Sequence, residues 1–233
     1  MNRMVGVMGG ELKPVAVSFA EPMSDDAIHA EADTRTIAEF RADKYPSTDP
    51  SYLSGQMARL AIMPVLLTNR CKEQDGGWTG TEAERFGLAE ELMLGADCLD
   101  WELSAPNIDE AVDLAHGQDK IIVVSTHNFK TTPPTEEMED QLERALEIGA
   151  DFVKFACSAK TIEQYQLLAE FTLRHREDNV IVVAMDDYGP LSRIALPGLG
   201  SRLTYAFPGN KAVAPGQLSS KETRTLLDKF YPV

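Results

Sequence analysis

Phe152-Val153-Lys154-Phe155-Ala156 is a short apolar run with a single lysine at its centre. The apolar run before it, Ile121-Ile122-Val123-Val124-Ser125-Thr126, is followed directly by His127. An amphipathic segment over 135–148 separates the two runs, and short apolar runs that alternate with helical segments are typical of βα units. We therefore predict two successive parallel strands that bring Lys154 and His127 to the same end of a sheet.

The same alternation repeats eight times along the chain. The predicted strands cover 14–19, 36–41, 64–69, 98–103, 120–126, 152–156, 179–185 and 202–207. The predicted helices cover 24–32, 50–60, 81–94, 107–116, 135–148, 161–175 and 219–230. Prolines and glycines break up the stretch 188–200, where we expect no long helix.

Eight such units in one chain of 233 residues indicate an α/β fold, a single-domain (β/α)8 barrel over 1–233 with a short N-terminal extension over 1–13. The alternative is an open doubly wound sheet. That fold is typically marked by a glycine-rich turn after the first strand, but the segment 18–22 has no glycine. Gly198-Leu199-Gly200 also lacks the third glycine of a dinucleotide fingerprint, so we predict no nucleotide cofactor.

The charge balance limits the possible partners. Asp and Glu number 37 against 22 Lys and Arg, which gives a net charge of -15. Such a chain repels phosphate backbones and anionic lipids, so we predict no nucleic-acid and no membrane partner. The chain has no apolar run of 18 residues and no signal-peptide pattern, so we expect a cytoplasmic protein. Three widely spaced cysteines and four histidines offer no metal-ligand spacing, so we predict no metal.

Charged residues alternate with apolar ones near the ends of three predicted strands. They are Glu39, Arg41, Arg70, Asp100 and Glu102. Side chains two residues apart share one face of a strand, and the outer face of a barrel is packed under helices, so these charges must point into the lumen. Unpaired charges there would cost several kcal/mol each, which predicts a connected network. The network either binds a polar ligand or consists of ion pairs that only fix the fold.

Lys154 is the strongest candidate for chemistry. Apolar surroundings remove the hydration that favours an ammonium, so a nucleophilic amine becomes available to attack a ketone. The alternative is a structural lysine that is paired with Glu39, Asp100 or Glu102. His127 is a second candidate for a catalytic residue because it closes the strand before that of Lys154.

Seven motifs follow one another along almost the whole chain: Glu39-x-Arg41, Thr68-x-Arg70, Asp100-x-Glu102, Ser125-x-His127-Asn128-Phe129-x-x-Thr132-Pro133, Lys154-Phe155-Ala156, Ser192-Arg193 and Ala214-Pro215-Gly216-Gln217. Each is weak by itself, but their order at barrel spacing resembles the type I 3-dehydroquinate dehydratase family. The resemblance implies a (β/α)8 barrel, usually dimeric, that converts 3-dehydroquinate, a small anionic substrate, to 3-dehydroshikimate in the shikimate pathway without metal or nucleotide.

The resemblance also implies three catalytic residues. Lys154 would condense with the C3 ketone of the substrate to give an imine, whose positive charge acidifies the C2 proton. His127 would remove that proton as general base and then protonate the departing C1 hydroxyl as general acid. Glu39, together with Arg41, would orient the ring hydroxyls and hold His127 in its working charge state.

Further residues are implied to bind the substrate. Arg70 and Arg193 would donate charge-assisted hydrogen bonds to the C1 carboxylate and nearby oxygens. The loop 208–218 resembles the lid of the family, from which Gln217 would contact the substrate and exclude water.

Three positions depart from the family pattern. Val213 stands where the family usually has serine. The segment from Arg70 to Gly76 is one residue longer than usual, and it offers Asp75 where a glutamate commonly precedes a Gly-Gly pair. Asp186 follows Met185, where glycine is common. Either Asp75 makes the contacts of that glutamate from the longer loop or those contacts are missing.

Two other functions remain open. Another imine-forming barrel, an aldolase of sugar or keto acids, would share Lys154 but would not need His127, Arg193 and Gln217 together. A non-catalytic ligand sensor on the same barrel would tolerate the changes at Val213 and Asp75.

Overall fold

The computed structural model describes residues 3–9, 12–209 and 214–232, and within these it confirms the predicted barrel. All strand pairs are parallel, and their order is β7-β6-β5-β4-β3-β2-β1-β8-β9. The strands are β1 (Val15–Phe19), β2 (Thr36–Arg41), β3 (Val65–Thr68), β4 (Cys98–Glu102), β5 (Ile121–Asn128), β6 (Phe152–Ser158), β7 (Val180–Met185), β8 (Thr204–Phe207) and the two-residue β9 (Leu218–Ser219).

The barrel closes between β7 and β8 through a short segment that precedes β8. The backbone N–H of Arg202 donates to the carbonyl of Val180 at 2.9 Å. The hydroxyl of Ser201 accepts a hydrogen bond from the backbone N–H of Val182 at 2.9 Å. The junction between β7 and β8 is therefore held partly by a side chain, whereas the other neighbouring strands are joined by a regular ladder of backbone hydrogen bonds.

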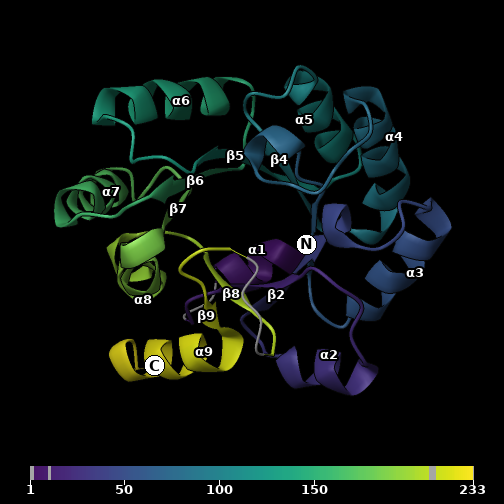
Figure 1. The fold of residues 1–233 in the computed structure, drawn as a ribbon, viewed down its shortest axis with the longest axis horizontal. Helices are drawn as coiled ribbons and strands as arrows, with labels where there is room; N and C mark the ends of the chain where they lie inside the picture. Colours follow the sequence, from purple (N-terminus) through teal and green to yellow (C-terminus); the bar gives the residue numbers. More distant parts are fainter. Residues whose placement is uncertain (1–2, 10–11, 210–213, 233) are drawn as a thin grey trace.

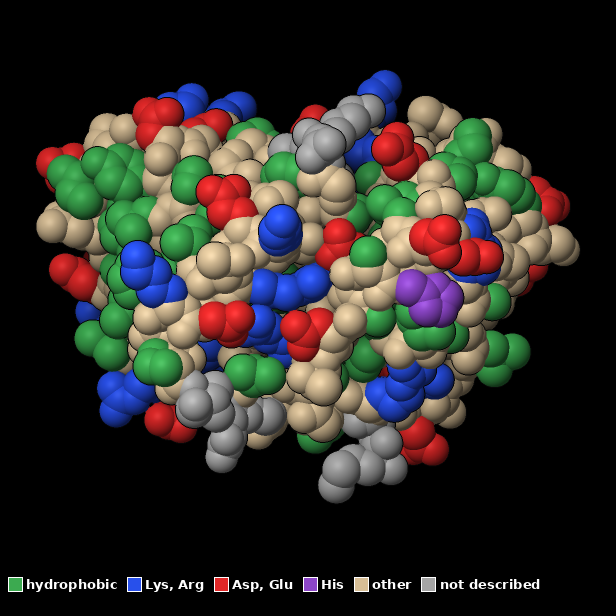
Figure 2. Space-filling model, turned by 90° about the horizontal axis from the view of Figure 1, so that it is seen from below, with side chains coloured by type: hydrophobic (Ala, Val, Ile, Leu, Met, Phe, Trp, Pro, Cys, Tyr) green, Lys and Arg blue, Asp and Glu red, His purple; other side chains and the backbone are tan. Residues whose placement is uncertain are grey.

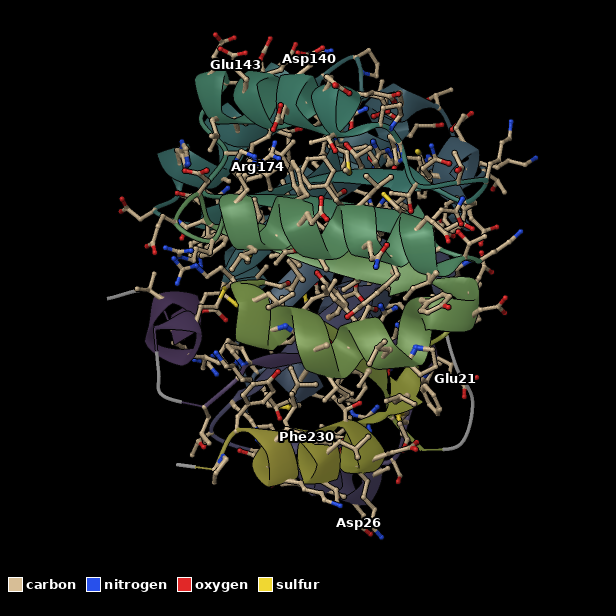
Figure 3. The ribbon with its side chains drawn as sticks, turned by 90° about the vertical axis from the view of Figure 1, so that its left-hand side faces the viewer. Glu21, Asp26, Asp140, Glu143, Arg174 and Phe230 are labelled. Carbon is tan, nitrogen blue, oxygen red and sulfur yellow. The ribbon has the colours of Figure 1, made fainter. Side chains whose placement is uncertain are left out.

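A ring of helices surrounds the strands (Figure 1). The helices are α2 (Asp25–Glu31), α3 (Pro50–Leu60), α4 (Glu82–Leu92), α5 (Ile108–Gly117), α6 (Thr135–Glu147), α7 (Ile162–Arg174), α8 (Gly189–Leu199) and α9 (Ser220–Phe230). Short 3-10 turns occupy η1 (Ala42–Lys44), η2 (Lys72–Gln74), η3 (Met93–Gly95) and η4 (Asp186–Tyr188). Figure 3 shows α6, α7, α8 and α9 stacked in that order along one side of the barrel.

The helix α8 corrects the expectation that 188–200 holds no long helix. Pro190 is its second residue, where a helix does not use the backbone N–H. Pro197 lies in the last turn, so its missing N–H removes one backbone bond only near the end of the helix. Gly200 then ends the helix with a φ of 123°. Both prolines therefore stand where a helix tolerates them.

The N-terminal extension contains a further helix, α1 (Arg3–Met8), which the sequence did not predict. Its side chains Met4 and Met8 are buried against the apolar lower half of the barrel interior, which includes Ile37, Leu66, Cys98 and Ile181. In Figure 3, α1 lies at one end of the barrel, whereas Glu21, just after the end of β1, lies at the opposite end. The helix thus covers the end where the strands begin.

Two ion pairs join α9, the last helix of the ring, to α2 and to the segment that follows α2. Arg35, just before β2, pairs with Asp228 of α9 at 2.7 Å, and Arg224 of α9 pairs with Glu31 of α2 at 2.8 Å. On this face basic and acidic side chains lie next to each other (Figure 2). The chain therefore closes its outer helical ring where α9 meets α2.

The register of the strands arranges the inward-pointing side chains of the barrel in layers. Phe40 and Trp101, the apolar residues between the charged positions of β2 and β4, face outward into the helical layer and pack in the main hydrophobic core. Above the apolar layer at the strand starts, the inward positions become polar and charged toward the strand ends. Because α1 closes the apolar end, the polar end is where a ligand can enter.

Candidate active site

A pocket with about 570 Å³ of empty space, part of it open to solvent, lies at the carboxyl ends of the strands. The structure brings together in its lining all eight side chains that the sequence nominated: Glu39, Arg41, Arg70, Asp75, His127, Lys154, Arg193 and Gln217. The other lining residues include Gln74, Phe129, Met185 and Tyr205. Five different strands and three loops contribute to one cavity, which is how a barrel assembles a site.

Lys154 lies in β6 at the level of Ser125 in β5, and it is 5% exposed. Its Nζ atom is 3.0 Å from Oδ2 of Asp100 and 4.3 Å from the centre of the Tyr205 ring. The expectation of purely apolar surroundings is therefore wrong. The structure instead contains one of the pairings that the sequence left open, with Asp100, and adds a cation–π contact. Despite these contacts, the amine of Lys154 remains part of the pocket lining.

Asp100 is the centre of a buried charge network. Arg70 donates to Oδ1 of Asp100 at 2.6 Å and to Oε1 of Glu102 at 2.8 Å. Arg85 of α4 pairs with the other oxygen of Glu102 at 2.8 Å. Burial alone would raise the pKa of Asp100, but the charges of Arg70 and Lys154 outweigh it and hold that pKa well below its usual range. The carboxylate is therefore ionised at all physiological pH values.

Glu39 and Arg41 project from β2 into the same pocket. Glu39 accepts hydrogen bonds from the hydroxyls of Ser18 and, at 3.3 Å, Thr68. Arg41 donates two hydrogen bonds to the buried Asp43, at 2.9 and 2.8 Å. These bonds fix both side chains before any ligand arrives, as a preorganised binding site requires.

His127 lies inside β5, which runs two residues further than predicted. Its Nδ1 atom is 2.7 Å from Oε1 of Gln74, and its ring stacks on Phe129. Burial, followed by the charges of Arg70 and Lys154, lowers the pKa of His127 well below its ordinary value, although Asp100 acts in the opposite direction. The imidazole is neutral in the resting pocket and available as a base.

Gln74 was not among the site residues predicted from the sequence. The signal was its spacing, because Gln74 stands four residues after Arg70, where the family usually carries a glutamate. The residue predicted for these contacts was Asp75, which stands directly before the Gly-Gly pair. The structure places Asp75 at the rim of the pocket, exposed, with a φ of 59° that ends the turn η2. It is Gln74 that contacts the histidine.

Arg193 presents a partly unused guanidinium to the pocket. The side chain is 2% exposed, and its Nη1 donates to the carbonyl of Ala184 at 2.6 Å. Its Nε finds no hydrogen-bond partner among the described residues. Burial lowers the pKa of Arg193 to about 10, which still leaves the group charged at neutral pH. A buried cation that lacks an acidic partner in the described part of the chain suits an anionic ligand.

The segment 214–217 crosses the mouth of the pocket. Oε1 of Gln217 accepts a hydrogen bond from the backbone N–H of Ala214 at 3.1 Å. Gly216, with a φ of 75°, approaches Gly189 so closely that a Cβ atom on either would meet the Cα atom of the other at 2.6 or 2.7 Å. The predicted lid over 208–218 is described only in part, and Val213 lies outside the described residues.

Among the described residues, no group of three or more His, Cys, Asp or Glu side chains has the arrangement of a metal site. The described helices include none with the length and apolar character needed to cross a membrane. The polar groups that line the pocket include an amine, an imidazole, carboxylates, amides and guanidinium groups.

Comparisons with known proteins agree with this geometry. The family model for type I 3-dehydroquinase matches residues 13–231. The 3-dehydroquinate dehydratase of Methanococcoides burtonii is 32% identical over 231 residues, 96% of this chain and 97% of that protein, and the enzyme of Methanocella arvoryzae is 34% identical over 205 residues, 88% and 92% of the two chains.

Solved structures give the same result. The 3-dehydroquinate dehydratase of Geobacillus kaustophilus superposes with a TM-score of 0.86 at 26% identity, covering 97% of this chain and 94% of that one. The type I enzyme of Clostridium difficile, solved with covalently modified comenic acid, gives a TM-score of 0.84 at 26% identity and covers 96% and 94%.

Proposed function

The chain belongs to the type I 3-dehydroquinase family, and from this premise we propose that it dehydrates 3-dehydroquinate to 3-dehydroshikimate through an imine on Lys154. The observation that carries the proposal is one pocket in which a buried lysine and a neutral histidine lie on adjacent strands, with Arg193 free to bind an anion. The proposal places the enzyme in the shikimate pathway.

The reaction begins when Lys154 releases a proton to solvent and its free amine attacks the C3 carbonyl carbon of the substrate; a proton from solvent is taken up again by the carbinolamine hydroxyl as it leaves. The resulting carbinolamine loses its hydroxyl as water and becomes a cationic imine. His127 then takes the C2 proton, and the electron pair of the broken C–H bond moves toward the imine nitrogen. As that enamine collapses, the C1 hydroxyl leaves with the proton from His127 as a second water. Water finally hydrolyses the imine, which restores the amine and releases the product.

The remaining residues hold the substrate for these steps. Arg193 binds the C1 carboxylate, because its guanidinium is charged and its buried Nε has no hydrogen-bond partner among the described residues. Glu39 and Arg41, both fixed by their own hydrogen bonds, bind ring hydroxyls. Arg70 is engaged by Asp100 and Glu102, so its main contribution is the positive charge that it adds near His127. Gln217 approaches from the segment 214–217 across the mouth.

The experiment is incubation with 3-dehydroquinate while the ultraviolet absorbance of the conjugated product is followed, with borohydride added to trap the imine. We expect product together with a covalent mass adduct that maps to Lys154. Lys154→Ala should abolish both, whereas His127→Ala should lose most turnover yet still form the adduct. Lys160→Ala, an exposed lysine two residues beyond β6, is the matched control and should change neither.

The same experiment separates the alternatives. An adduct without product in the unmodified chain would favour the ligand sensor, and turnover of a sugar or keto acid in place of 3-dehydroquinate would favour the aldolase. Absence of both adduct and product would reject the imine mechanism. The homodimer and the cytoplasmic location stay predictions.

A further inference from the structure

We propose that Arg85, a buried residue of α4 that does not line the pocket, is a positioning residue for the amine of Lys154. It acts through a chain of buried contacts in which positive and negative charges alternate: Arg85, Glu102, Arg70, Asp100 and Lys154. Through this chain, Arg85 limits how tightly Asp100 holds the lysine. The inference rests on the proposed function, in which Lys154 is the nucleophile.

The guanidinium of Arg85 is fixed from several sides, although the residue lies on a helix of the outer ring. Arg85 is fully buried, and its Nη1 donates to the carbonyl of Asn69 at 2.6 Å. Its plane covers the ring of Trp101, 3.7 Å from the ring centre. Nε and Nη2 donate to the carboxylate of Glu82 at 2.8 and 2.6 Å. These contacts place Nη2 2.8 Å from Oε2 of Glu102.

Glu102 lies between two arginines. Its Oε1 accepts hydrogen bonds from Nη1 of Arg70 at 2.8 Å and from the backbone N–H of Cys71 at 3.1 Å. Its Oε2 faces Arg85 in an orientation that forms no hydrogen bond, so this contact acts through charge. Without Arg85, the buried carboxylate would keep Arg70 as its single cation among the described residues, and it would draw that guanidinium toward itself.

Arg70 divides its guanidinium between the two carboxylates of β4. Nη2 donates to Oδ1 of Asp100 at 2.6 Å, and Nη1 donates to Glu102 at 2.8 Å. The other oxygen of Asp100 accepts from Nζ of Lys154 at 3.0 Å. If Arg70 moves toward Glu102, it neutralises less of the charge on Asp100. Asp100 then holds the ammonium more strongly, and the free amine that attacks a ketone becomes rarer.

Other titratable groups share the pocket with Lys154 and act on it directly. They come from β2, β5, β8, α8 and the turn after β3, and they are Glu39, Arg41, Asp75, His127, Arg193 and Tyr205. All of these side chains are kept in the variants below. A change in the reactivity of Lys154 therefore reports the chain of charges that begins at Arg85.

The test measures the reactivity of the Lys154 amine without substrate. Each protein is labelled with trace acetic anhydride between pH 6 and pH 10, and acetylation of Lys154 is followed by peptide mass spectrometry, with the exposed Lys160 as internal reference. Arg85→Gln should slow the labelling of Lys154 about tenfold at pH 7. The difference should shrink toward pH 10, because the ammonium is lost there. A general loosening of the fold would not produce this pH dependence.

Glu82→Gln should act in the opposite direction. Glu82 shares Nη2 of Arg85 with Glu102, at 2.6 against 2.8 Å, and its side chain is 30% exposed. Without the Glu82 charge, Arg85 neutralises Glu102 more fully, and Arg70 is left to Asp100. Labelling of Lys154 at pH 7 should then rise about twofold. This partly exposed position also provides the test if Arg85→Gln does not fold.

The double variant Arg85→Gln with Glu102→Gln removes both charges of the outer pair, while the new amide keeps an oxygen for Arg70. It should restore labelling of Lys154 to within about twofold of the unmodified chain, because residues that act through each other are not additive. Arg59→Gln is the matched control. Arg59 of α3 also donates to a carboxylate and a backbone carbonyl, those of Asp25 and Met23, at 2.7 and 2.6 Å. Its loss should leave the labelling unchanged.

An unchanged labelling rate in Arg85→Gln, or a double variant as slow as the single one, would overturn the inference. If Arg85→Gln does not fold, an unchanged rate in Glu82→Gln would overturn it. In turnover assays, Arg85→Gln should lower kcat about tenfold with little change in KM, because the substrate-binding side chains stay in place. Labelling needs no substrate, so failure of the unmodified chain to convert 3-dehydroquinate would reject the proposed function, and the labelling rates would still decide the role of Arg85.

Discussion

The ammonium nitrogen of Lys154 lies 3.0 Å from the carboxylate of Asp100, which precedes it by 54 residues in the chain. The two side chains project from β6 and β4 into the barrel interior, where both are nearly excluded from solvent. The nucleophile of the proposed reaction is therefore stored as half of an ion pair. A substrate must compete with Asp100 for the same nitrogen before an imine forms.

Removal of the Asp100 charge should destabilise the fold. In Asp100→Asn the cations Arg70 and Lys154 lose a common partner, and breaking a buried ion pair in this way costs about 3–5 kcal/mol. Urea unfolding followed by circular dichroism measures the loss. Asp113→Asn, at an exposed position of α5, should change the free energy of unfolding by less than about 0.5 kcal/mol. Equal stability of the two variants would show that the network adds nothing to the fold.

Stability should fall as the pH is lowered from neutrality. The pKa of His127 is lower in the folded chain than its ordinary value near 6.5, so the unfolded chain binds more protons below that pH, and the free energy of unfolding decreases there. The lowered pKa of Asp100 adds a second loss below about pH 4. Urea titrations from pH 8 to pH 3 test this. His127→Gln should flatten the part between pH 6.5 and 4, and an unaltered curve would contradict the assignment of a buried neutral histidine.

Substitutions of Tyr205 can separate the contribution of its aromatic ring from that of its hydroxyl. The ring face holds the Lys154 ammonium 4.3 Å from its centre, whereas the buried hydroxyl has no hydrogen-bond partner among the described residues. Tyr205→Phe should keep imine trapping and leave stability equal or higher by about 1 kcal/mol, because an unsatisfied polar group is removed. Tyr205→Leu should slow borohydride trapping through loss of the cation–π contact. If Phe and Leu trap equally fast, the ring does not position the lysine.

The N-terminal helix should contribute measurably to stability. Met4 is fully buried beneath the barrel, so Met4→Ala leaves a cavity that costs about 2–5 kcal/mol. Val5 is next to it and 48% exposed, so Val5→Ala is expected to cost far less. Thermal unfolding of both variants gives the comparison. A similar melting temperature for both would mean that α1 does not pack beneath the barrel in solution.

The sequence predicted the barrel and the pocket because both follow from periodicity. Lys154 and His127 could be placed near each other because Lys154 interrupts one apolar strand and His127 ends the strand before it. In the structure, the register of these two strands sets His127 opposite Ala156, two residues after Lys154. The partner of the lysine could only be narrowed to three carboxylates, because choosing among them requires side-chain geometry across two strands. Asp100 is the carboxylate that pairs with the lysine, because it lies in the lumen beside Arg70.

Other features depended on contacts distant in the chain. The contact of Gln74 with His127 depends on a turn closed by Asp75, which residue counting alone could not assign. The helix α1 is stabilised by burial of Met4 and Met8 against strands that come much later, so its local sequence gave no periodic signal. The sequence did not predict α8 because it contains two prolines, and only their positions, at the second residue and in the last turn, make them compatible with a helix.

Gly189 offers a steric test of the segment that carries Gln217. The φ of Gly189 is ordinary for a helix, so alanine is allowed by the backbone, but its Cβ atom would lie 2.6 Å from the Cα atom of Gly216. Gly189→Ala should therefore displace Gly216 and move Gln217 away from the pocket. We expect KM for 3-dehydroquinate to rise about tenfold. Imine trapping at saturating substrate should be retained, because Lys154 and His127 are not touched.

Gly87→Ala is the control, in α4 with open space around its Cα. It should leave KM unchanged and add about 0.5–1 kcal/mol of stability. An unchanged KM in Gly189→Ala would show that the close contact between the two glycines is not what holds Gln217 at the substrate.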